Sequence, residues 1–222
     1  MPQSDTSITK PFVLAFFYTL SCIPFLIFSE LYGPITAPLI KAAPIAFLAF
    51  FLASKIASAE RRWMYLALLC SASGDILLEL DFALSFTLGL SAFLAAQLTY
   101  ACRFWLNRDR SLSAWKPIAA MSAFALVMML ILLPRTGEMT VPVLLYIAAI
   151  CSMGAGALAF KGESWAKWGA MIFIFSDSCI AINKFVEPFA ASSFAIMSSY
   201  YVAQFLIIYG VLKSSSSEPS PS

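Results

Sequence analysis

The stretch RWMYLALLCSASGDILLEL, residues 62–80, decides the fold class of this chain. A helix of about 20 mainly apolar residues is long enough to cross about 30 Å of hydrocarbon. Similar apolar blocks lie on both sides of it, at residues 11–29, 35–54, 84–105, 115–133, 141–160, 165–183 and 191–212. The sequence therefore predicts an all-α polytopic membrane protein, built as a bundle of about eight transmembrane helices.

The composition agrees with a membrane-embedded chain. Of the 222 residues 61% are hydrophobic and only 12% are charged, whereas soluble domains carry about 25% charged residues. The connections between the blocks are short, so residues 1–213 are expected to form a single transmembrane domain. The remaining low-complexity tail, residues 214–222, is expected to be disordered. A net charge of +2 provides no basic field for nucleic acid.

Basic residues in the connections predict the orientation of the helices, because they concentrate on the cytoplasmic side. With eight spans, only Arg135 and Lys184 fall on one side of the membrane. The other side receives Lys10, Lys55, Arg61, Arg62, Arg103, Arg108, Arg110, Lys116, Lys161, Lys167 and Lys213. We therefore expect both termini in the cytoplasm, and a multi-pass protein of a bacterial inner (cytoplasmic) membrane.

Histidine is absent from the chain, which excludes Ser-His-Asp and Cys-His catalysis and zinc sites that need imidazole. The five cysteines all lie inside apolar blocks, without a CxxC spacing. We interpret them as small buried hydrophobic residues rather than as disulfide or metal partners. Neither a metal nor another cofactor is expected.

Three ionisable residues lie well inside the predicted spans: Lys41, Asp75 and Asp177. Each costs at least about 2.5–3.5 kcal/mol to insert, so such residues are functional candidates. The alternating direction of the spans places all three roughly 7–10 Å below the outer surface. Two carboxylates in one polar cavity suit acid/base chemistry, because one can hold a proton while the other is ionised. The alternative is an ion pair in which Lys41 neutralises one aspartate and holds helices together.

Five local sequences around these positions resemble, in the same order, those of the YhhN-type lysoplasmalogenases. They are LIKAAPIAFL (39–48), SASGDILLEL (71–80), FTLGLSAFLAAQLTY (86–100), FIFSDS (173–178) and SSYYVAQFLI (198–207). In the third of them the family pattern has histidine or glutamine where this chain has Gln97. The resemblance covers most of the chain and implies a polytopic membrane hydrolase of lipid metabolism.

The resemblance implies cleavage of the vinyl ether bond of a lysoplasmalogen, giving a fatty aldehyde and a glycerophospho-base. The substrate would be a lysophospholipid drawn from the membrane lipids. Protonation of a vinyl ether carbon and addition of water need an acid and a base, much as at a glycosidic bond. Asp75 and Asp177 would be the catalytic pair. The supporting residues would be Lys41, Ser71, Gly74, Glu79, Gln97, Tyr100, Ser176, Asn183, Tyr200, Tyr201 and Gln204.

Lateral entry from the outer half would place the lipid chain along spans 35–54, 84–105 and 191–212. Three other functions are compatible with the same residues. A small-solute or proton-coupled transporter also uses intramembrane Asp and Lys, although neither an internal repeat nor a pair of broken spans is visible. A non-catalytic organiser or lipid sensor would use the acids only to hold helices together. A hydrolase of another lysolipid could act by direct attack of water.

Overall fold

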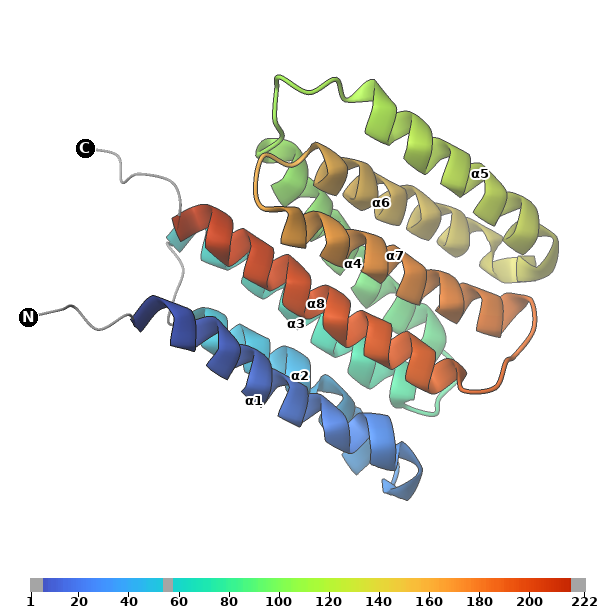
Figure 1. The fold of residues 1–222 in the computed structure, drawn as a ribbon. Coiled ribbons are helices and arrows are strands. Elements are labelled where there is room, and N and C mark those ends of the chain that lie inside the picture. The colour runs from blue at the N-terminus through green and yellow to red at the C-terminus, as the bar shows by residue number, and fades with distance from the viewer. Residues whose placement is uncertain (1–5, 54–57, 217–222) are drawn as a thin grey trace, which may run out of the picture.

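A computed structural model describes residues 6–53 and 58–216, which form eight α-helices (Figure 1). They are α1 (Thr6–Phe28), α2 (Thr36–Ala53), α3 (Ser58–Glu79), α4 (Ser85–Leu106), α5 (Trp115–Thr136), α6 (Thr140–Ala159), α7 (Ser164–Phe185) and α8 (Ser192–Ser216). Short 3₁₀ turns at Ser29–Leu31 and Gly137–Met139 follow α1 and α5. Each apolar block of the sequence corresponds to one helix, and the all-α prediction is confirmed.

Five segments of the described chain are long and apolar enough to cross a membrane. They are Phe12–Leu31, Ser85–Leu106, Trp115–Ala159, Ser164–Phe185 and Ser192–Ser214, and the third covers both α5 and α6. Thr36–Leu52 is a shorter apolar helix. The stretch 62–80 within α3 is not among the five, because charged and small polar residues lower its hydropathy. The chain is a multi-pass membrane protein, and the number of crossings and the side of each terminus remain predictions.

The helices lie side by side along nearly parallel axes, and successive helices run in opposite directions (Figure 1). The start of α1 and the end of α8 are at the same end of the bundle. The helix α7 packs along α8, α3 packs along α4, and α5 covers the outer side of α6. We call the opposite end of the bundle the distal end. It contains the ends of α3 and α7 and the starts of α2, α4, α6 and α8.

Small residues allow α7 and α8 to approach closely. A Cβ atom at Gly169 would lie 2.7 Å from the backbone nitrogen of Ile207, and one at Gly210 would collide with the backbone of Ala166. Such contacts replace bulky packing where membrane helices cross. The helix α8 continues to Ser216, and the rest of the expected tail, residues 217–222, lies outside the described residues.

Candidate active site

Asp75 on α3 and Asp177 on α7 are both buried in the distal half of the bundle. Their exposed fractions are 1% and 7%. Asp75 lies four residues before the end of α3, and Asp177 lies eight residues before the end of α7. A buried carboxyl needs hydrogen-bond partners, and each of the two has a different set.

The carboxyl of Asp177 receives two hydrogen bonds on one oxygen. Nε2 of Gln97 on α4 lies 3.1 Å from Oδ2, and the phenol of Tyr146 on α6 donates to the same atom. Within the described chain no hydrogen bond reaches Oδ1. Gln97 is fully buried, and its Oε1 atom has no hydrogen-bond partner among these residues. Tyr146 is not among the residues predicted from the sequence, although a lone phenol inside the apolar stretch LLYIAAI requires a polar partner.

Asp75 belongs to a second cluster, between α3, α4 and α8. The phenol of Tyr200 donates to Oδ2 of Asp75 over 2.8 Å. One turn away, Nε2 of Gln204 donates to Oγ of Ser71 over 2.9 Å, and Tyr100 donates to Oε1 of Gln204 over 2.6 Å. All five side chains are buried. The structure thus brings these predicted residues together.

Lys41 forms its ion pair with Glu79. Their Nζ and Oε2 atoms are 2.8 Å apart, and the ammonium also lies 5.5 Å above the ring of Phe25. The ion-pair partner of Lys41 is therefore Glu79, and not an aspartate as the alternative from the sequence had it. On α3, Glu79 lies one helical turn nearer the distal end than Asp75. There its carboxylate meets the side chain of Lys41, which comes from the start of α2. Tyr201 anchors this part of α2 by donating to the backbone oxygen of Lys41 over 2.7 Å.

The remaining predicted supporting residues, Ser176, Asn183 and Gly74, make hydrogen bonds or packing contacts between helices and connections. Oγ of Ser176 donates to the backbone oxygen of Ile196, 2.8 Å away, which joins α7 to α8. Asn183 accepts a hydrogen bond from the backbone of Phe189 in the connection between these helices. A Cβ atom at Gly74 would lie 2.5 Å from the ring of Phe93, so the glycine makes room for that ring.

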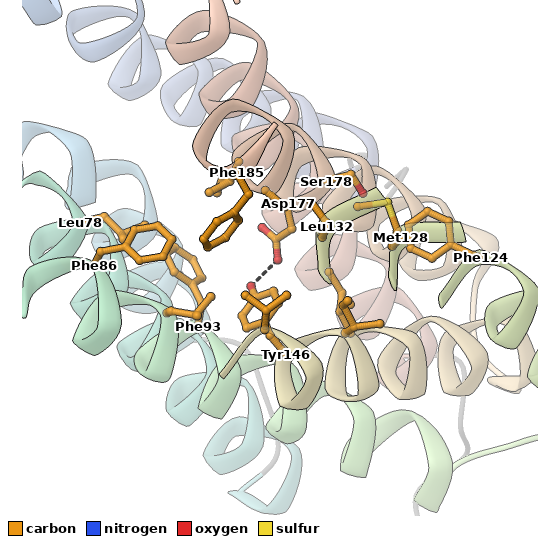
Figure 2. A pocket seen from close by; sticks show the side chains of 16 residues that line it. Leu78, Phe86, Phe93, Phe124, Met128, Leu132, Tyr146, Asp177, Ser178 and Phe185 are labelled. Atoms are coloured by element: carbon orange, nitrogen blue, oxygen red, sulfur yellow. Dashed lines mark hydrogen bonds between the residues drawn. The ribbon is translucent and has the colours of Figure 1, made fainter. Parts of the chain in front are cut away.

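Asp177 lines a cavity that is otherwise almost entirely apolar (Figure 2). The cavity lies between α3, α4, α5, α6 and α7 and is partly open to the surroundings. The polar side chains in its wall are those of Asp177, Tyr146 and Ser178. Such a lining, with a few convergent polar groups, is typical of a site for a small apolar ligand.

Asp75 does not line this cavity, so the two aspartates do not share it as expected. Phe93 is part of the wall, and its ring packs edge-on against Tyr200, with ring centres 5.7 Å apart. Tyr200 in turn binds Asp75. The lipid chain is expected along three spans, and one of them lines this cavity. Of the spans 35–54, 84–105 and 191–212, only the second contributes residues to this wall.

Comparisons with known proteins identify the family of this chain. The sequence pattern of the YhhN family matches residues 36–211. The chain is 34% identical to a lysoplasmalogenase of Mycobacterium tuberculosis over 190 residues, 82% of this chain and 73% of that protein. It is 31% identical to human lysoplasmalogenase TMEM86A over 214 residues (89% and 88%) and 32% identical to human lysoplasmalogenase TMEM86B over 179 residues (80% and 76%). No solved structure matches the chain.

Both polar clusters and the cavity lie within the matched residues. The match covers well over half of the chain, and the curated relatives match most of its length. The chain therefore belongs to the YhhN family.

Proposed function

We propose that the protein is a membrane-embedded lysoplasmalogenase that cleaves the vinyl ether bond of its lipid substrate with water. One observation carries the proposal: the carboxyl of Asp177 borders an otherwise apolar cavity, with one oxygen held by two donors and the other without a hydrogen bond in the described chain. The relatives named lysoplasmalogenase provide the substrate class.

In the proposed reaction, Oδ1 of Asp177 holds the proton that is transferred to the substrate. The proton adds to the vinyl carbon that does not carry oxygen, and the carbon bonded to oxygen becomes an oxocarbenium ion. Water adds to that carbon, and the resulting hemiacetal breaks into a fatty aldehyde and the free hydroxyl of the glycerophospho-base. The hydrogen bonds from Tyr146 and Gln97 stabilise the carboxylate that remains after proton transfer.

Asp75 is the second carboxylate of the proposal. Its negative charge stabilises the oxocarbenium ion, and it accepts a proton from the attacking water. Because the ring of Phe93 in the cavity wall packs against Tyr200 of the Asp75 cluster and separates Asp75 from the cavity, the proposal requires this ring to turn aside during the reaction. In the structure this ring occupies the space that a Cβ atom at Gly74 would take.

Glu79 of the Lys41–Glu79 pair is the last residue of α3 and lies nearer the distal end than either aspartate. The pair is partly exposed, with exposed side-chain fractions of 12% and 30%. In the proposal the ammonium of Lys41 binds the lipid phosphate. The distal end is then the outer side of a bacterial inner membrane, and all eight helices cross with both termini in the cytoplasm.

The test is a product analysis with three matched lysolipids. Purified protein is incubated with an alkenyl, an acyl and a saturated alkyl lysophospholipid that share headgroup and chain length. The proposal predicts fatty aldehyde from the alkenyl lipid alone. Fatty acid from the acyl lipid would identify an ester hydrolase instead. Uptake of an unchanged solute into vesicles, with no product from any lipid, would identify a transporter.

A further inference from the structure

One wall of the Asp177 cavity is a regular stripe on α5. Phe124, Met128 and Leu132 are spaced four residues apart, so they lie on one face of the helix, and all three line the cavity. Leu126 and Leu130 of the same helix point elsewhere, with exposed fractions of 55% and 68%. The helix α5 thus presents one face to the cavity and another to its surroundings.

The facing wall is a second stripe, on α6. It consists of Val143, Tyr146, Ile147 and Ile150, spaced three or four residues apart. Apart from the phenol of Tyr146, which is bonded to Asp177, this wall also has no polar side chain. The two stripes enclose a slot whose sides are hydrocarbon and aromatic rings.

The slot extends further into the bundle than the carboxyl. Phe124 lies twelve residues before the end of α5, about 18 Å along the axis, whereas Asp177 lies about 12 Å from the end of α7. Figure 2 shows Phe86 and Phe185 on one side of Asp177 and Met128 and Phe124 on the other. A ligand that lies along the slot therefore passes the carboxyl and continues inward for about one helical turn.

We propose that this slot binds the hydrocarbon chain of a single-chain ether lipid and that Phe124 forms its inner end, so that α5 sets the preferred chain length. The inference rests on the proposed function, because it is the vinyl ether that must lie beside Asp177. The headgroup then lies towards Phe86 and Phe185, and the chain runs inward between the stripes of α5 and α6. Each methylene that enters the slot strengthens binding about fourfold.

A groove elsewhere on the bundle is less suitable for this ligand. It lies between α1 and α8 and is bordered by Tyr18, Cys22, Tyr201 and Phe205. No carboxylate lines it. A chain bound there would not place its ether bond beside Asp177, so this groove does not fit a reacting lipid.

The experiment measures binding separately from turnover. Saturated O-alkyl lysophospholipids with chains of increasing length compete with a fluorescent lysolipid for the full-length protein in nanodiscs. These lipids have no vinyl ether and are not cleaved. In the wild type, affinity should rise with each methylene and then level off. Phe124→Ala should move the plateau to longer chains, and Met128→Phe should move it to shorter ones.

Leu130→Ala is the matched control, because it shortens an exposed side chain on the same helix, and its profile should equal that of the wild type. If folded Phe124 and Met128 variants keep the wild-type profile, or if the control shifts as they do, the inference is wrong. A wild type that binds these lipids with a length limit but releases no aldehyde from the alkenyl lipid would contradict the proposed function alone.

Discussion

The phenol of Tyr146 on α6 donates a hydrogen bond to Oδ2 of Asp177 on α7, beside an apolar cavity. Together with Nε2 of Gln97, it holds one carboxyl oxygen, while the other has no hydrogen bond within the described chain. In our mechanism this bond becomes stronger as Asp177 gives up its proton, because a carboxylate is a better acceptor than a carboxylic acid.

Tyr146→Phe should therefore lower kcat for the alkenyl lysolipid by about 10- to 100-fold and change KM little, since a hydrogen bond to a charged group contributes about 1.5–3 kcal/mol. Aldehyde release from purified protein measures both constants. Tyr65→Phe on α3 is the control, because this half-buried phenol donates no hydrogen bond within the described residues. A kcat of Tyr146→Phe within threefold of the wild type would remove Tyr146 from the site.

Asp177→Asn and Asp75→Asn should each reduce turnover by about 10²–10⁴-fold, the usual contribution of a general acid or base. The amide keeps the size of the carboxyl and can still accept the bonds from Tyr146 and Tyr200. Thermal stability should therefore stay near that of the wild type. A purely structural role predicts the reverse: a lower Tm, and activity that falls only in proportion to the folded protein.

Lys41→Met and Glu79→Gln separate the two roles of the distal ion pair. If Lys41 binds the lipid phosphate, Lys41→Met raises KM for the lysolipid, while Glu79→Gln leaves a free ammonium and does not. If Lys41 serves only to pair with Glu79, both variants lower Tm alike and neither affects KM specifically. Steady-state kinetics with a phosphate-containing lipid and with one that lacks phosphate decide between these roles.

The orientation can be tested with single cysteines at Leu84 and Trp115, introduced into a chain without its native cysteines. Both positions are exposed, with fractions of 60% and 65%, and they precede α4 and begin α5 respectively. A membrane-impermeant thiol reagent on intact spheroplasts should label position 84 and leave position 115 unlabelled. The opposite pattern would reverse the topology and the proposed side of lipid entry.

The fold could be predicted from the sequence because every helix coincides with an apolar block. Asp75 and Asp177 could be found for a related reason, since a carboxyl inside such a block is costly unless it has a use. The Lys41–Glu79 pair was missed because Asp75 and Glu79 are one turn apart on α3. Which of them meets Lys41 depends on how α2 packs against α3, and spacing alone does not determine that packing.

Tyr146 and the cavity could not be predicted from the sequence. Tyr146 is a single phenol in an apolar helix and is part of no spacing pattern. Its partner, Asp177, comes 31 residues later in the chain. The cavity depends on how the face of α5 that carries Phe124 and Met128 lies against α6 and α7. The position of Phe93, between the two polar clusters, likewise follows from the space at Gly74 on a neighbouring helix.

The role of Asp177 as proton donor is tested most directly by running the reaction in D₂O and trapping the fatty aldehyde as it forms. Protonation of the vinyl carbon by Asp177, whose acidic proton exchanges with solvent, predicts one deuterium on the carbon next to the aldehyde group. The Asp177→Asn variant should yield little or no aldehyde. Aldehyde without deuterium at that carbon, or an unchanged rate in the variant, would show that Asp177 does not protonate the vinyl ether.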